Sequence, residues 1–263
     1  MFSFSAELSL NPPLRRERTV VRPTHEVVMQ LVEDSPRPTA RTIGIVYLLY
    51  FLTGIFGALL MKGVVVPTDA VATAQNLLAH KSVYRSGWEV GLVANALYIA
   101  VTALFYGLLA PVNRSLAVMM AFFSLVGCIV QIFGGLLQVA PLTILRDNQM
   151  AGAFTVVQLQ SAAQLSFKLY PEVFNISLVL FALFDFLLGY LIYKSTFLPR
   201  FIGVWFMIAG VVGLMFLWPP LGTALRYVII PIGGLAEVVL MFWLIVKGVD
   251  VSKWRELPAF SVH

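Results

Sequence analysis

Six apolar runs, each about long enough to cross a lipid bilayer, limit what this chain can fold into. A hydrocarbon core of about 30 Å needs about 20 helical residues that rise about 1.5 Å each. The run from Thr42 to Met61, for example, carries no charge. Charged residues make up only 12% of the chain, against about 25% in a soluble domain. We therefore predict an integral membrane protein.

The apolar runs lack the alternation of polar and apolar residues that β-barrel strands show, so we expect each to be a helix that satisfies its own backbone. The predicted spans are Thr42–Met61, Trp88–Ala110, Leu116–Leu142, Phe174–Tyr193, Phe201–Trp218 and Tyr227–Val246. The predicted fold is an all-α, polytopic transmembrane bundle of about six spans over residues 41–249. Residues 1–40 form a polar, basic N-terminal tail, and residues 250–263 form a short C-terminal tail.

The distribution of basic residues predicts the orientation. With the N-terminus inside, twelve of the 18 lysines and arginines fall on the cytoplasmic side. This bias favours cytoplasmic termini in a multi-pass protein of the cell inner membrane. The net charge of +5 therefore reflects topology, and we expect no nucleic-acid partner.

Two connecting segments carry helix signals of their own. Pro67-Thr68-Asp69 predicts the start of a short amphipathic helix, with Thr68 as its N-cap. The stretch from Val156 to Tyr170 predicts either an interfacial helix or an outer extension of the fourth span. Pro219 and Pro220 are predicted to lie in a tight turn, where a missing N–H costs little.

The N-terminal tail contains five prolines and no apolar run of spanning length. It does not resemble a cleavable signal peptide, because no apolar segment promptly follows its basic residues. Alone it cannot bury enough surface to fold. We predict that its arginines contact a partner protein on the cytoplasmic side; the candidates are Arg15, Arg16, Arg18 and Arg22.

Three polar residues lie deep in the predicted spans: Asp185, Glu237 and Gln131. At about 1.5 Å per residue, they fall in a similar layer near the midplane. Ionisable groups there are costly and point by default to function. One interpretation is a polar site that binds a cation or passes a proton. The other is that each acid is neutral and hydrogen-bonded to a neighbouring helix, since a low dielectric disfavours the charged form.

Several chemistries are disfavoured. None of the three histidines lies in a predicted span, which argues against a bis-histidine haem or a buried metal site of histidine and cysteine. The chain has no P-loop, no dinucleotide-binding glycine motif and no Gly-x-Ser-x-Gly nucleophile motif. We therefore predict neither enzymatic activity nor a cofactor.

Three blocks carry a family resemblance: Leu108 to Ala117 with the following Ala-Phe-Phe, Gly189 to Arg200, and Leu235 to Val249. Together with Arg41 to Phe56 they resemble a bacterial multi-pass membrane family catalogued as domain of unknown function 4386. The resemblance implies a bundle of six or seven helices without an assigned activity, and it places Glu237 in the closing motif of the family.

Two departures from the family pattern bear on function. Ser124 stands where the family often has arginine, and Phe184 stands where it often has histidine. The loss of two ionisable positions favours a structural role over shared polar chemistry.

Two function hypotheses follow. The first is a non-catalytic accessory or structural subunit that packs against a larger membrane protein complex. The alternative is a small transporter, or an ion- or proton-responsive membrane protein, that uses the midplane carboxylates. Binding of a lipid, quinone or pigment in a groove between helices is a third possibility.

Overall fold

The computed structural model describes residues 36–146 and 152–256, and every regular element within these ranges is a helix. Six helical segments are long and apolar enough to cross a membrane. They are α2 (Pro36–Met61), α4 (Lys81–Leu109), α5 (Arg114–Ile144), α7 (Val156–Lys194), α8 (Arg200–Gly213) with the 3₁₀ helix η1 (Leu214–Leu217), and α9 (Pro219–Val246). Two shorter helices are α3 (Ala70–Ala79) and α10 (Val251–Arg255). The predicted all-α, multi-pass membrane architecture is confirmed.

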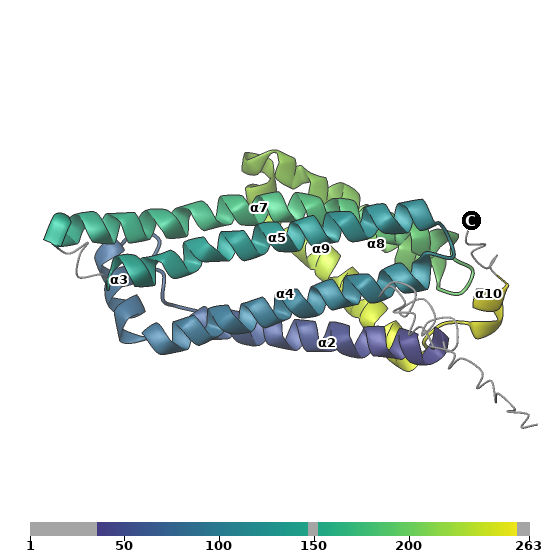
Figure 1. Cartoon of the computed structure of the whole chain (residues 1–263). Coiled ribbons are helices and arrows are strands. Elements are labelled where there is room, and N and C mark those ends of the chain that lie inside the picture. Colours follow the sequence, from purple (N-terminus) through teal and green to yellow (C-terminus); the bar gives the residue numbers. More distant parts are fainter. Residues whose placement is uncertain (1–35, 147–151, 257–263) are drawn as a thin grey trace, which may run out of the picture.

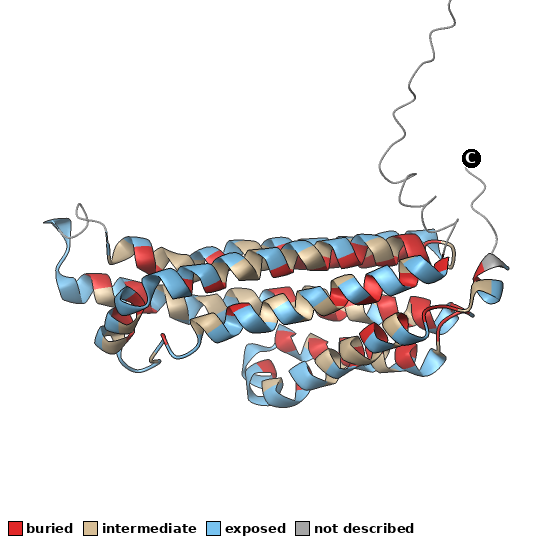
Figure 2. Ribbon diagram, turned by 90° about the horizontal axis from the view of Figure 1, so that it is seen from below, coloured by how far each residue is buried: buried red, intermediate tan, exposed pale blue. Residues whose placement is uncertain are grey.

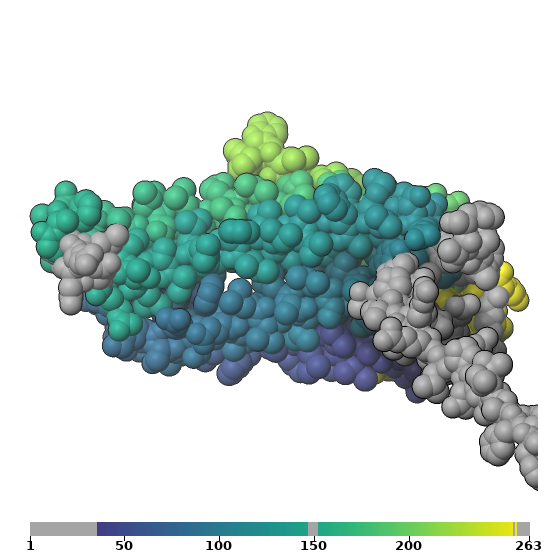
Figure 3. All heavy atoms as spheres, in the orientation of Figure 1, coloured from purple at the N-terminus to yellow at the C-terminus, as the bar shows by residue number. Residues whose placement is uncertain are grey.

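The long helices form two antiparallel pairs, α2 with α4 and α5 with α7, with α8 packed on α7 and α9 crossing to α2 (Figure 1). The short helix α3 lies at one end of the molecule and α10 at the other, which we call the α3 end and the α10 end. A seam between the two pairs runs along the face shown in Figure 3. The space between the two helix pairs is therefore either filled by the remaining helices or left open.

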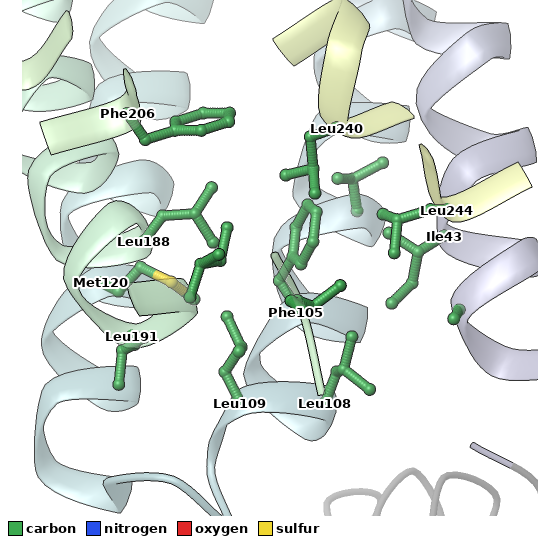
Figure 4. Packing of buried hydrophobic residues seen from close by; sticks show 14 of the residues in the cluster. Ile43, Phe105, Leu108, Leu109, Met120, Leu188, Leu191, Phe206, Leu240 and Leu244 are labelled. Atoms are coloured by element: carbon green, nitrogen blue, oxygen red, sulfur yellow. The ribbon is translucent and has the colours of Figure 1, made fainter. Parts of the chain in front are cut away.

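The main core joins the pairs toward the α10 end. Its fully buried members come from facing helices, and they include Phe105, Met120, Leu188, Phe206 and Leu240 (Figure 4). Buried positions are dense toward this end in Figure 2. A smaller cluster of Val64, Leu77, Tyr84 and Leu142 lies near the α3 end. The two pairs are thus held together by apolar packing at two separate levels.

Close helix approaches depend on glycine. An added Cβ at Gly189 of α7 would lie 2.5 Å from the carbonyl oxygen of Gly203 in α8. At Gly203 it would lie 2.6 Å from the carbonyl oxygen of Gly189. The backbones of α7 and α8 therefore touch at this crossing, as small residues permit inside membranes. This contact fixes the depth and rotation of the segment of α7 that carries Asp185.

The stretch from Val156 to Tyr170, predicted as either an interfacial helix or an extension of the fourth span, is an extension of that span. Helix α7 runs without interruption from Val156 to Lys194, so the stretch before residue 171 is an extension of the span and not a separate interfacial helix. Pro171 lies inside the helix without ending it. Helix α3 packs against this extension, and both protrude at the α3 end in Figure 1.

Some boundaries differ from the predictions. Asp69, not Thr68, is the N-cap of α3, because its carboxylate accepts a hydrogen bond from the Ala72 N–H at 2.9 Å. Pro219 and Pro220 open α9 instead of forming a separate turn, since the first helical N–H groups need no intrahelical partner. Helix α2 begins at Pro36, so the last residues assigned to the tail continue into the first span.

The short helix α10 closes the described part of the C-terminus. Asp250 is its N-cap, and the Ser252 hydroxyl and the Lys253 N–H donate to its carboxylate. These hydrogen bonds lower the pKa of the exposed Asp250 carboxyl. The Trp254 indole is buried and donates to the Leu108 carbonyl at 3.4 Å. The helix is thereby docked onto the end of α4.

Candidate functional site

The three midplane residues predicted from the sequence meet in one cavity. It has a volume of about 270 Å³ and lies between the two apolar clusters of the bundle. All six spans contribute to its lining. The residues that line it are Tyr50, Phe51, Tyr98, Gln131, Phe174, Leu178, Phe181, Ala182, Asp185, Ala209, Gly213, Phe216, Ile229, Ile230, Gly233, Gly234 and Glu237.

Asp185 reaches the cavity from α7, and the hydrogen-bonding capacity of its carboxyl group is incompletely used. Its Oδ1 atom is buried and makes no hydrogen bond with the described residues. Its Oδ2 atom faces α9 at Gly233, where an added Cβ would lie 3.9 Å away. A buried carboxylate oxygen without a donor is costly. No hydrogen bond from the described residues therefore ties the Asp185 Oδ1 atom to a neighbouring helix.

Glu237 enters the same cavity from α9. The Tyr98 hydroxyl donates to its Oε1 atom at 3.3 Å. The Tyr47 hydroxyl faces the same carboxylate but makes no hydrogen bond of normal geometry. Glu237 and Asp185 lie close enough for their charges to interact, and both are half-buried. Within the described part of the chain, one hydrogen-bond donor thus serves two carboxylates, which leaves acceptor capacity inside the cavity.

Among the described residues, the lining contains no basic side chain to neutralise these acids. Gln131 of α5 supplies the remaining side-chain amide. No group of three or more histidine, cysteine, aspartate or glutamate residues in the described chain is arranged to hold a metal ion. The charge character of the cavity is therefore set by two carboxylates alone.

Helix α9 is continuous from Pro219 to Val246 but carries helix-weakening residues beside the site. Pro231 lies inside the helix, where it removes one backbone hydrogen bond. Gly233 and Gly234 follow, and an added Cβ at Gly234 would meet no atom within 4 Å. The Trp205 indole donates to the Ile232 carbonyl at 3.1 Å and ties this stretch to α8. A proline and two glycines thus lie in α9 at the level of the cavity, and the two glycines line it.

Aromatic rings form much of the remaining wall. The ring centroid of Tyr98 lies 4.8 Å from that of Tyr50 and 5.3 Å from that of Phe181. Tyr47 is fully buried behind Tyr98, with 6.1 Å between their centroids. These tyrosines were missed by the sequence analysis. Their position inside spans, away from the interfaces where tyrosine is common, was the available signal.

Toward the α10 end the cavity is closed. One turn beyond Tyr98, the Thr102 and Ser124 hydroxyls form a buried hydrogen bond of 2.7 Å between α4 and α5. The fully buried residues of the main core follow. Ser124 thus contributes a small hydroxyl that is paired with Thr102 and does not reach the cavity lining.

The four arginines predicted to contact a partner, Arg15, Arg16, Arg18 and Arg22, lie outside the described residues. The role proposed for them stays a prediction.

Comparisons with known proteins agree with the architecture. The family described as domain of unknown function (DUF4386) matches residues 42–248. Neither the curated proteins nor the solved structures yield a match. The family match spans all six membrane helices and includes Asp185 and Glu237.

Proposed function

This chain belongs to the DUF4386 family, and we propose that it is a small transporter or ion-responsive membrane protein whose midplane cavity binds a cation. The observation that carries the proposal is the convergence of Asp185 and Glu237 on one cavity to which residues 36–146 and 152–256 contribute no basic side chain. Acids inside a membrane that face an interior cavity commonly mark ion or proton pathways. The first hypothesis from the sequence, an accessory subunit, becomes the second candidate.

The geometry of the acids supports binding more than packing. A structural pair of acids would be expected to have both carboxyl groups hydrogen-bonded and the space between the helices filled. Here Asp185 has an unpartnered oxygen and the space is about 270 Å³. We propose binding or translocation and not catalysis, since the sequence offers no nucleophile motif or cofactor motif.

A carbodiimide test examines this proposal without knowledge of the natural ligand. Dicyclohexylcarbodiimide is apolar and reacts with protonated carboxyl groups, which makes it suited to acids within the membrane. We expect it to label Glu237 or Asp185 in the purified full-length protein, as read by peptide mass spectrometry. A cation that occupies the cavity should protect against labelling. Sodium, potassium and trimethylammonium compounds form the test panel.

Matched variants locate the effect. Glu237→Gln and Asp185→Asn should each remove the label at the substituted site and weaken protection at the other. Glu89→Gln is the control, because Glu89 pairs with Arg85 at 3.1 Å on the exposed surface. Labelling that no cation in the panel reduces would refute cation binding.

The accessory-subunit hypothesis depends on the N-terminal segment, which lies outside the described residues. It predicts that native purification in mild detergent recovers a defined second protein, and that deletion of residues 1–35 loosens this association while the bundle stays inserted. Recovery of the full-length chain alone would argue against it. Localisation in a bacterial inner membrane is likewise part of the proposal, since the six spans themselves support only a multi-pass membrane protein.

A further inference from the structure

We infer that the cavity selects a small organic ammonium ion that carries apolar groups, in preference to an inorganic metal ion. This inference rests on the proposed cation site and specifies its ligand class. Three features of the lining bear on it: the number of oxygen ligands, the aromatic wall, and the space kept open by glycine.

The oxygen ligands are too few for a strongly coordinated metal ion. Calcium takes about six to eight oxygen ligands, and magnesium demands near-octahedral coordination. The side-chain oxygens of the described lining belong to two carboxylates, one amide and the hydroxyls of Tyr50 and Tyr98, and one carboxylate oxygen already accepts from Tyr98. Neutral tyrosine hydroxyls are not among the usual ligands of calcium or magnesium. The same two carboxylates are enough for an ammonium group, which needs charge compensation but no complete coordination shell.

The aromatic wall suits such a cation. Six rings line the cavity, from Tyr50, Phe51, Tyr98, Phe174, Phe181 and Phe216. Tyr98 touches Glu237 through its hydroxyl and packs by its ring against Tyr50, so aromatic rings and a carboxylate lie side by side. Quaternary ammonium groups bind within aromatic cages through cation–π attraction. A hydrated inorganic ion would gain little from these rings.

The cavity has room for a small molecule. Its volume of about 270 Å³ is just below the range of drug-sized ligand pockets, about 300 to 1,000 Å³, which suits a ligand of a few heavy atoms. Gly213, Gly233 and Gly234 line it without side chains. The remaining wall of leucine, alanine and isoleucine side chains favours apolar groups on the ligand over a shell of ordered water.

The test compares choline with 3,3-dimethylbutan-1-ol, an uncharged molecule of the same shape. Both are titrated against carbodiimide labelling of the full-length protein, with sodium and potassium chloride as inorganic competitors. We expect choline to protect Glu237 at least about tenfold more tightly than the neutral alcohol or either salt. Equal protection by the alcohol would overturn the inference in favour of a merely apolar pocket.

Aromatic variants test the wall itself. Tyr50→Leu keeps apolar bulk but removes a ring. It should weaken protection by choline about two- to thirtyfold, the range of a cation–π contact, and should leave protection by the alcohol unchanged. Tyr98→Phe keeps the ring and should retain most of the preference for charge. Phe133→Leu is the control, because Phe133 is 66% exposed on α5 and lies outside the cavity lining.

The outcomes separate the two proposals. Protection by sodium or potassium but not by choline would overturn the ammonium inference and leave the cation site standing. Loss of preference for choline in Phe133→Leu as well as in Tyr50→Leu would show a general packing effect and overturn the role of the wall. No protection by any cation would overturn both.

Discussion

Substitution of Gly189 by alanine tests whether the contact between α7 and α8 holds the candidate site in place. The added methyl carbon would lie 2.5 Å from the Gly203 carbonyl oxygen and 2.6 Å from the Met207 amide nitrogen. Both obstacles are backbone atoms, so no side-chain rotation relieves them. Restoring ordinary contact distances of about 3.5 Å requires the helices to separate by roughly 1 Å. Overpacking of this kind typically costs about 1–3 kcal/mol.

Alanine also favours helix over glycine by about 0.8–1.0 kcal/mol, so the net effect at Gly189 is expected to be a destabilisation of up to about 2 kcal/mol. Gly54→Ala is the matched control, because an added Cβ at Gly54 meets no atom within 4 Å. The gain in helix propensity from glycine to alanine is common to both variants. The difference between their free energies of unfolding should therefore report the packing cost of about 1–3 kcal/mol.

Equilibrium unfolding in mixed detergent and SDS micelles measures this difference. Gly203→Ala should behave like Gly189→Ala, and the double variant should cost less than the sum of the two, because the first methyl group already separates the helices. Asp185 lies one helical turn from Gly189, so carbodiimide labelling of Asp185 should change as well. Equal unfolding free energies for Gly189→Ala and Gly54→Ala would refute the reasoning.

Three further predictions concern the surroundings of the cavity. In a double-mutant cycle, Thr102→Val and Ser124→Ala should show a coupling of about 0.6 kcal/mol, typical of hydrogen bonds inside membrane proteins; zero coupling would exclude their 2.7 Å bond. The folded-state pKa of Asp250 is lowered, so its stabilisation of α10 is complete above the ordinary carboxyl pKa and is lost as pH falls through the lowered value. The fluorescence of Trp254 in α10 should follow this loss in the wild type. It should not do so in Asp250→Asn, because asparagine caps the helix without titrating. Gly233→Val should fill the cavity beside Asp185 and abolish cation protection in the labelling assay, whereas Gly54→Val should leave protection unchanged.

The depth of the polar residues could be predicted from the sequence, but their convergence could not. Counting residues from the span ends places Asp185 and Glu237 in a similar layer, because a helix has a fixed rise. Counting does not tell which way each side chain points around its helix axis, nor how the helices are ordered. The close contact of Gly189 with Gly203 and the crossing of α9 toward α2 decide that both acids face the same space.

The tyrosines also separate what the sequence can predict from what only the packing of the helices determines. Tyr47, Tyr50 and Tyr98 are visible in the sequence only as aromatic residues within apolar runs. They lie on two different helices, and their role follows from ring contacts between α2 and α4 and from the single hydrogen bond to Glu237. No periodicity within one run can report contacts between two runs.

The amino-acid sequence alone determined that this chain crosses a membrane as helices. A backbone in lipid satisfies its hydrogen bonds only within helices or closed barrels, and the apolar runs lack the alternation of barrel strands. It also determined where each span ends to within two residues, whereas four of the six helices begin six to eighteen residues before the predicted starts. It further determined that a few polar groups had to be accommodated between the spans. The tertiary structure decided that those groups share a cavity and are not packed away separately. Lipid is as apolar as the helix surfaces, so burial of apolar area does not select one helix arrangement, and the choice rests on close packing at small residues and a few hydrogen bonds.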